Sequence, residues 1–155
     1  MTRTRLLILA ALLAAIAALA FLTTRPDQAS DGLLAYRDAT TIARGETLYA
    51  EHCAACHGAN LQGEPDWRTP DAEGYMPAPP HDPTGHTWHH PDAQLFAITK
   101  FGTQALVGGT YKSRMEGYEN ILSDADIRAT LAYIKSTWPP DIIARHNRIN
   151  ANATD

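Results

Sequence analysis

The stretch EHCAACHGANLQG, residues 51–63, contains both cysteines of the 155-residue chain. Cys53 and Cys56 are three positions apart, and His57 follows directly. A thioredoxin-like redox pair would need flanking βαβ elements, which the sequence does not predict, and a structural zinc site would need further ligands. Two thiols on one helical turn, with an imidazole next in sequence, indicate covalent attachment of a c-type haem. Cys53 and Cys56 would then form the thioethers, and His57 would be the proximal iron ligand.

Residues 1–22 have the pattern of an export segment. Arg3 and Arg5 precede an uncharged run, Leu6–Leu22, and Ala18–Ala20 offers small residues for cleavage. As a helix this run would rise about 25 Å, near the lower limit for crossing a bilayer. A cleaved signal peptide and a retained N-terminal membrane anchor both stay open, with the anchor favoured. In either case the rest of the chain is exported, in agreement with the haem motif, because such attachment takes place outside the cytoplasm.

The composition is that of a globular, acidic protein. The formal charge of the chain is −4, and the first twenty residues contain two arginines and no acidic residue. An acidic exported domain lacks the positive charge that binding to nucleic acid requires, whereas a partner with a basic surface would complement it. Ten glycines and ten prolines, many of them between residues 58 and 109, predict long loops in the middle of the chain.

The apolar spacing predicts three helices and no convincing strand pair. The first spans about Thr41–Cys53, with Thr40 or Thr41 as N-cap. The second spans Asp92–Phe101 and ends at Gly102. The third spans Ser123–Thr137, begins with a capping box, and ends before two prolines. Its apolar face is formed by Ile127, Leu131, Ile134 and Trp138. Residues 23–37 read as a polar linker, and residues 141–155 as a frayed, polar C-terminal tail.

From about Thr40 to Trp138 the chain resembles a class I c-type cytochrome domain of the small bacterial mono-haem kind. The similarity is carried by GETLYAEHCAACHGANLQG, residues 45–63, and MEGYENILSDADIRATLAYIKSTWP, residues 115–139. The resemblance implies an all-α fold in which about three to five helices and long loops rich in Pro and Gly surround one covalently bound haem c. The domain would span residues 38–140. The first and last helices would cross at Gly45, with Tyr49 against Tyr133.

Two methionines are candidates for the distal iron ligand. Met76 lies nineteen residues after His57, and Met115 lies eight residues before the final predicted helix begins. The resemblance favours Met115, because in the family this ligand comes from the loop leading into the last helix. Glu116 departs from the proline that usually follows the methionine. The resemblance also implies that a backbone carbonyl from residues 77–80 accepts a hydrogen bond from Nδ1–H of the proximal histidine.

The haem propionates need hydrogen-bond donors, because carboxylates beside a partly buried haem must be paired. Trp88 and Arg114 are the main candidates, and further donors are Tyr111, Lys112, Trp67 and Arg68.

Four histidines lie within ten residues, and three interpretations of them stay open. They could ligate iron, bind a separate copper or zinc ion, or line a rigid loop over the haem. The last is favoured because no second ligand type completes a site. The residues are His81, His86, His89 and His90.

These features together predict a one-electron carrier rather than a catalyst, because two protein ligands leave iron no open position for substrate. We expect it on the periplasmic side of the bacterial inner membrane. Its redox partners would be a periplasmic dehydrogenase or quinol-oxidising complex, and a terminal oxidase or reductase. The alternatives are a haem enzyme that binds small ligands or reduces peroxide, and a copper-handling module built on the histidines of residues 81–90.

Overall fold

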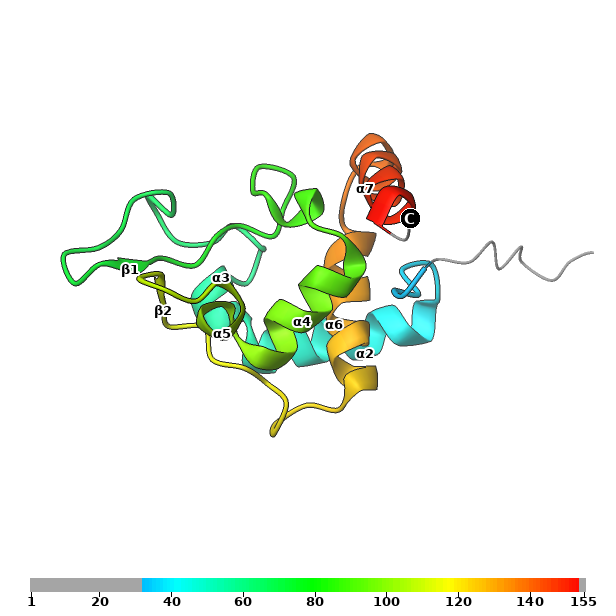
Figure 1. Cartoon of the computed structure of the whole chain (residues 1–155). Helices are drawn as coiled ribbons and strands as arrows, with labels where there is room; N and C mark the ends of the chain where they lie inside the picture. Colours follow the sequence, from blue (N-terminus) through cyan, green and yellow to red (C-terminus); the bar gives the residue numbers. More distant parts are fainter. Residues whose placement is uncertain (1–31, 154–155) are drawn as a thin grey trace, which may run out of the picture. The chain divides into compact units, whose positions relative to one another are not determined.

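A computed structural model describes residues 32–153 (Figure 1). The predicted export segment and most of the predicted linker lie outside the described residues. The fold is all-α, as predicted, although its six described α-helices exceed the three to five expected because two of them are short. In chain order the elements are α2 Ala39–His52, α3 Ala54–His57, β1 Tyr75–Met76, η1 Thr87–His89, α4 Asp92–Phe101, α5 Thr103–Val107, β2 Lys112–Ser113, α6 Asp124–Ser136 and α7 Pro140–Ala153.

Helix α2 begins two residues earlier than the sequence predicts. The N-cap is Asp38, whose Oδ1 accepts hydrogen bonds from the backbone N–H of Thr41 at 2.7 Å and from its hydroxyl at 2.6 Å. Thr41 therefore donates to the cap and is not itself the cap. The buried face of the helix comprises Gly45, Leu48 and Tyr49, in agreement with the predicted spacing.

Helices α2 and α6 cross at Gly45. A Cβ atom on this residue would lie 2.0 Å from the carbonyl oxygen of Ala129, so only glycine permits the observed approach. One turn further along α2, the ring of Tyr49 lies 5.6 Å from that of Tyr133. The crossing and the tyrosine pair implied by the resemblance are both confirmed.

Helices α4 and α6 match their predicted ranges closely. Ser123 caps α6, since its Oγ accepts the backbone N–H of Asp126 at 3.1 Å and donates to the Asp126 carboxylate at 2.9 Å. The helix buries Ile127, Leu131 and Ile134 as predicted. Gly102 ends α4 with φ 85°, a conformation that favours glycine.

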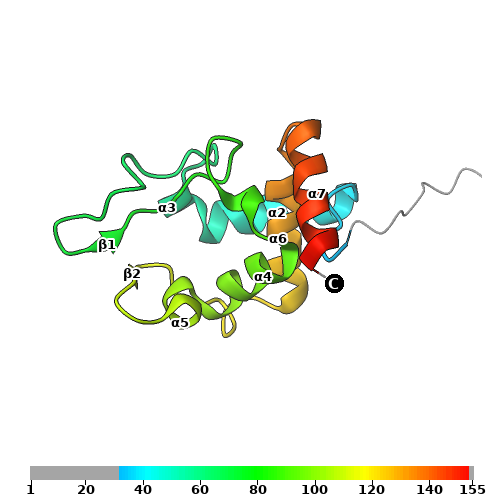
Figure 2. The ribbon, with the colours of Figure 1, turned by 45° about the horizontal axis from the view of Figure 1, so that its top comes forward.

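The long loop after α3 contains a short strand, β1, which pairs with β2. The sequence does not predict this strand pair. Strands β1 and β2 are parallel, with Tyr75 opposite Lys112 and Met76 opposite Ser113. Figure 2 shows the loop and the α5–β2 segment coming together at this pair. Two residues per strand are too few to show the alternation of apolar and polar residues that predicts a strand, so the sequence does not reveal this pair.

The predicted frayed tail is wrong for residues up to Ala153, which form α7. Pro140 occupies the first position of that helix, where a backbone N–H is not needed. The buried residues of α7 are Ile142 and His146. The side-chain oxygen of Asn150 accepts the backbone N–H of Asp92 at 2.7 Å and so caps α4, whose own N-cap, Pro91, makes no side-chain hydrogen bond.

The predicted linker also extends too far, because its last residues belong to the core. Leu34 is completely buried and Tyr36 nearly so. The Tyr36 hydroxyl accepts a hydrogen bond from the side chain of Asn147 on α7 at 3.2 Å. Within residues 32–153, no helix combines the length and the apolar character needed to cross a membrane.

Candidate functional site

Cys53, Cys56 and His57 lie on one turn of backbone at the junction of α2 and α3. Cys53 ends α2 through a backbone hydrogen bond to Tyr49 and at the same time precedes α3 as its N-cap. The N–H groups of Cys56 and His57 both donate to the carbonyl of Cys53, at 3.2 and 2.9 Å. Neither cysteine forms a disulfide within the described residues; Cys53 is partly buried and Cys56 is exposed. Burial and the neighbouring Cys56 raise the pKa of Cys53 to about 11.

The His57 imidazole is held in one tautomer. Its side chain is buried, and Nδ1 lies 2.8 Å from the carbonyl oxygen of Pro79. Because a carbonyl can only accept, Nδ1 carries the proton and Nε2 keeps its lone pair. No hydrogen bond to Nε2 occurs among the residues that the structure describes. Burial lowers the pKa of His57, which favours the neutral imidazole that binds metals. The predicted carbonyl from residues 77–80 is confirmed as that of Pro79.

The ring of His81 packs against the face of the His57 imidazole. The two rings stack with centroids 4.0 Å apart and an interplanar angle of 23°. Nδ1 of His81 lies 2.8 Å from the hydroxyl of Thr87, and its carbonyl accepts the indole N–H of Trp138 at 2.8 Å. Burial, followed by the nearby His57 and His86, holds the pKa of His81 well below its usual value. The sequence places this histidine in a loop over the haem, but spacing does not reveal its contact with the His57 ring.

Met115 lies in the loop between β2 and α6, with contacts on both sides. Its sulfur accepts the hydroxyl of Thr103 at 3.6 Å, and its backbone N–H donates to Oγ of Ser113 at 3.1 Å. The next residue, Glu116, forms an isolated antiparallel bridge with Gly102. The other candidate, Met76, is paired through β1 with β2, so both thioether side chains come from neighbouring segments. The assignment of the distal iron ligand to Met115 stays a prediction.

The two residues predicted to contact the propionates have other partners in this structure. The guanidinium of Arg114 lies between the carboxylates of Asp71 and Glu73, at 2.7 and 3.0 Å. The indole N–H of Trp88 donates to the carbonyl of Pro83 at 3.3 Å. Their contact with a propionate stays a prediction.

The remaining histidines of the loop contact aromatic rings. His86 stacks on Trp67, with centroids 5.1 Å apart and planes within 6°, and Arg68 lies over the same indole at 4.0 Å. The ring of His90 is 5.2 Å from that of His86. Within residues 32–153 there is no group of three or more His, Cys, Asp or Glu side chains placed to hold a metal ion.

The residues present fit a covalently bound haem. Two cysteines that form no disulfide share one turn with a buried imidazole whose Nε2 is available, and thioether side chains come from the segments paired at β1 and β2. This combination defines a haem-binding helical domain. A family model, described as cytochrome c, matches residues 42–138, more than half of the chain. The chain therefore belongs to the cytochrome c family, whose members generally carry electrons, and its cofactor is haem c. No curated protein and no solved structure gave a significant match.

Proposed function

We propose that this protein is a one-electron carrier in an electron-transfer chain on the periplasmic side of a bacterial inner membrane. The observation that carries the proposal is the turn of Cys53, Cys56 and His57, inside a region that matches the cytochrome c family. When bound, haem c supplies an iron that alternates between the ferric and ferrous states.

Each residue of the turn has a distinct role in this proposal. Cys53 and Cys56 anchor the haem through thioethers. The Pro79 carbonyl keeps the proton on Nδ1 of His57, so that Nε2 always faces iron in the same tautomer. Met115 supplies the second ligand, with its sulfur held by the hydroxyl of Thr103. If His57 and Met115 both bind the iron, they would leave no position open for a substrate.

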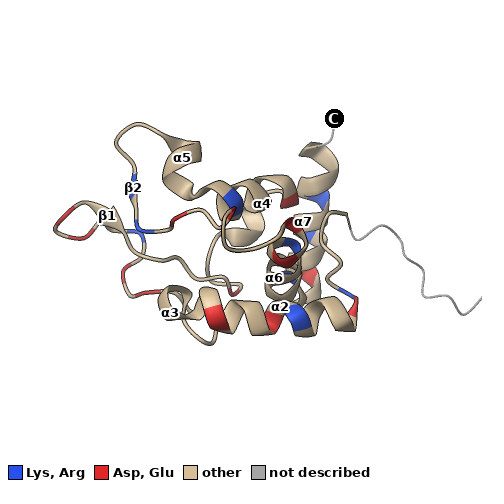
Figure 3. Cartoon of the chain, turned by 90° about the horizontal axis from the view of Figure 1, so that it is seen from below, with Lys and Arg blue, Asp and Glu red and all other residues tan. Residues whose placement is uncertain are grey.

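An uncharged surface near Met115 suits brief contacts with redox partners. Helix α5 carries no charged side chain, as Figure 3 shows, and Leu106 and Val107 on it are exposed. Complexes between electron-transfer proteins typically have small interfaces and are short-lived. We propose a dehydrogenase or quinol-oxidising complex as electron donor and an oxidase or reductase as acceptor, all outside the cytoplasm. The export pattern of residues 1–22 supports this location.

Absorption spectroscopy of the purified holoprotein tests the ligand assignment. The ferric protein should show a near-infrared methionine-to-iron charge-transfer band that Met115→Ala abolishes and the matched control Met76→Ala retains. Loss of the band in Met76→Ala instead would overturn the assignment. Rapid binding of carbon monoxide by the native ferrous protein would favour the haem enzyme over the carrier. Spectra of membrane and soluble fractions, recorded separately, would locate the protein.

A further inference from the structure

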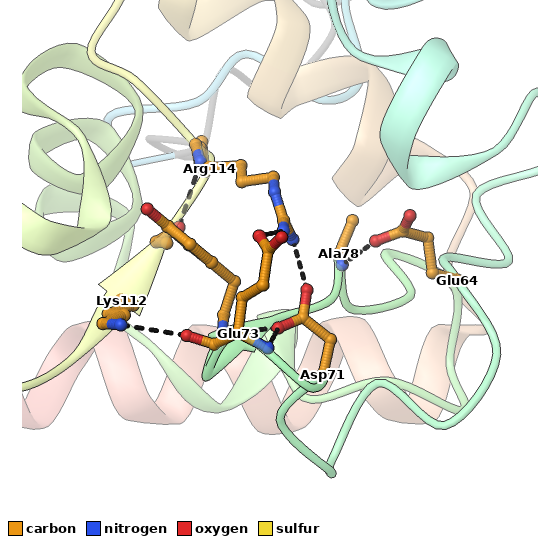
Figure 4. A network of polar contacts seen from close by, with 9 residues as sticks. Glu64, Asp71, Glu73, Ala78, Lys112 and Arg114 are labelled. Carbon is orange, nitrogen blue, oxygen red and sulfur yellow. Dashed lines mark hydrogen bonds and ion pairs between the residues drawn. The ribbon is translucent and has the colours of Figure 1, made fainter.

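Arg114 joins two segments that are far apart in the sequence. One of its terminal nitrogens lies 2.7 Å from the carboxylate of Asp71, and the other lies 3.0 Å from that of Glu73. Figure 4 shows the guanidinium of Arg114 beside these two carboxylates. Lys112 adds a third contact, because its ammonium donates to the backbone carbonyl of Glu73 at 2.9 Å. We call this group, Asp71, Glu73, Lys112 and Arg114, the loop clamp.

The acidic side of the loop clamp is a turn held by its own hydrogen bonds. Oδ1 of Asp71 accepts the backbone N–H groups of Glu73 and Tyr75, both at 2.9 Å. The backbone N–H of Asp71 donates to the carbonyl of Tyr75, and that of Gly74 to the carbonyl of Asp71, also at 2.9 Å. The carboxylates that meet Arg114 are therefore presented by an ordered turn.

Two further kinds of contact connect the same segments. The parallel pairing of β1 with β2 joins their backbones. The ring of Tyr75 lies 4.2 Å from the guanidinium carbon of Arg114 and 5.5 Å from the ammonium of Lys112, within the range of cation–π attraction. The ion pairs thus act on segments that are already in register.

The loop clamp lies close in sequence to the segments that hold both predicted iron ligands, His57 and Met115. Pro79, whose carbonyl holds His57, follows β1 by three residues. Met115 follows Arg114 directly. The loop clamp therefore connects the segment that orients the proximal imidazole with the segment that carries the distal thioether. We propose that Arg114 is a positioning residue, which through Asp71 and Glu73 keeps the Met115 segment in place and so restrains the replacement of Met115 by an outside ligand. This inference rests on the proposed function, in which Met115 is the distal ligand.

Solvent exposure limits the size of the effect. The side chain of Arg114 is 55% exposed, and those of Asp71 and Glu73 are 33% and 73% exposed. Exposed ion pairs contribute little to global stability, so thermal unfolding should change only slightly when the loop clamp is broken. Replacement of Met115 by an outside ligand needs only a local movement of the loop. The loss of two ion pairs should therefore increase the equilibrium constant for this replacement about three- to tenfold.

Binding of imidazole to the ferric holoprotein measures this restraint. In Arg114→Gln, imidazole should bind about three- to tenfold more tightly than in the wild type, while Arg114→Lys should recover part of the difference. The matched control is Arg44→Gln. Arg44 is equally exposed, at 55%, and pairs with Asp126 at 3.0 Å between α2 and α6. This control should bind imidazole as the wild type does. About 1 M salt should weaken the restraint in the wild type and leave Arg114→Gln unchanged, because the Debye length then falls to about 3 Å.

The outcomes separate this inference from the proposed function. Equal imidazole affinity in the wild type, Arg114→Gln and Arg44→Gln would overturn the role of the loop clamp. A wild-type protein without the methionine band would instead overturn the assignment of Met115. If Arg114→Gln does not fold, the double variant Asp71→Asn, Glu73→Gln breaks the same ion pairs from the other side and should show the same gain in affinity.

Discussion

Replacing Gly45 by alanine tests the helix crossing on which the haem site is built. A Cβ atom at this position would lie 2.0 Å from the carbonyl oxygen of Ala129 and 2.6 Å from its carbonyl carbon. It would also lie 2.9 Å from Cβ of Tyr133. These are backbone atoms and a side-chain root, which cannot rotate away as the end of a flexible side chain could. Helices α2 and α6 must therefore separate, since ordinary contacts begin near 3.4 Å.

Two opposing effects set the magnitude. Alanine is the better helix former, and at an exposed helix position it would stabilise the protein by about 1 kcal/mol relative to glycine. Overpacking of a well-packed interface typically costs about 1–3 kcal/mol, and a clash with backbone should reach or exceed the upper end of that range. Gly45→Ala should therefore lower the free energy of unfolding by about 2 kcal/mol. For a domain of this size that corresponds to a fall in Tm of about 10 °C.

Urea unfolding of the ferric holoprotein, followed by far-ultraviolet circular dichroism, measures the effect. The control is Ala50→Gly on the exposed face of the same helix, which should cost about 1 kcal/mol through helix propensity alone. Propensity alone would make Gly45→Ala stabilising by a similar amount, whereas the observed crossing makes it destabilising. A Gly45→Ala protein that unfolds at the same or a higher urea concentration than the wild type would refute the reasoning.

Three further predictions concern the ligand loop and α7. Under the proposed ligation by Met115, Thr103→Val removes the hydroxyl that donates to the Met115 sulfur, so the sulfur would become a better donor to ferric iron. The midpoint potential in a redox titration should fall by a few tens of mV. Asn150→Ala removes the cap of α4 and should lower the free energy of unfolding, measured in urea, by about 1 kcal/mol. Burial, followed by the charge of Lys135, lowers the pKa of His146 below its ordinary value of 6.5, so the unfolded chain binds the proton more readily. The unfolding free energy should therefore fall as the pH drops below about 6.5, and His146→Gln should reduce that slope.

The parts of this protein that could be predicted from sequence are those fixed by local chemistry. Helix α6 was predicted nearly residue for residue, because Ser123 caps it and its apolar spacing is regular. Helix α7 was missed because most of its residues are polar, and its buried His146 is accommodated by groups on other helices. The stacking of His81 on His57 and the ion pairs of Arg114 depend on residues more than twenty positions away. Spacing and composition carry no signal for such contacts.

The elements outside the matched region support the interior of the haem domain. Asp92 on α4, Lys135 on α6 and His146 on α7 are almost completely buried. The Asp92 carboxylate lies 3.6 Å from the ammonium of Lys135 and 3.4 Å from Nε2 of His146. Burying an isolated charge is costly, so the carboxylate of Asp92 and the ammonium of Lys135 need one another. The ring of His146 also packs edge-on against Trp138, at 5.1 Å, and Trp138 in turn donates to the carbonyl of His81. Helix α7 is therefore connected through Trp138 to His81, which stacks on His57, and it belongs to the framework that positions the His57 imidazole.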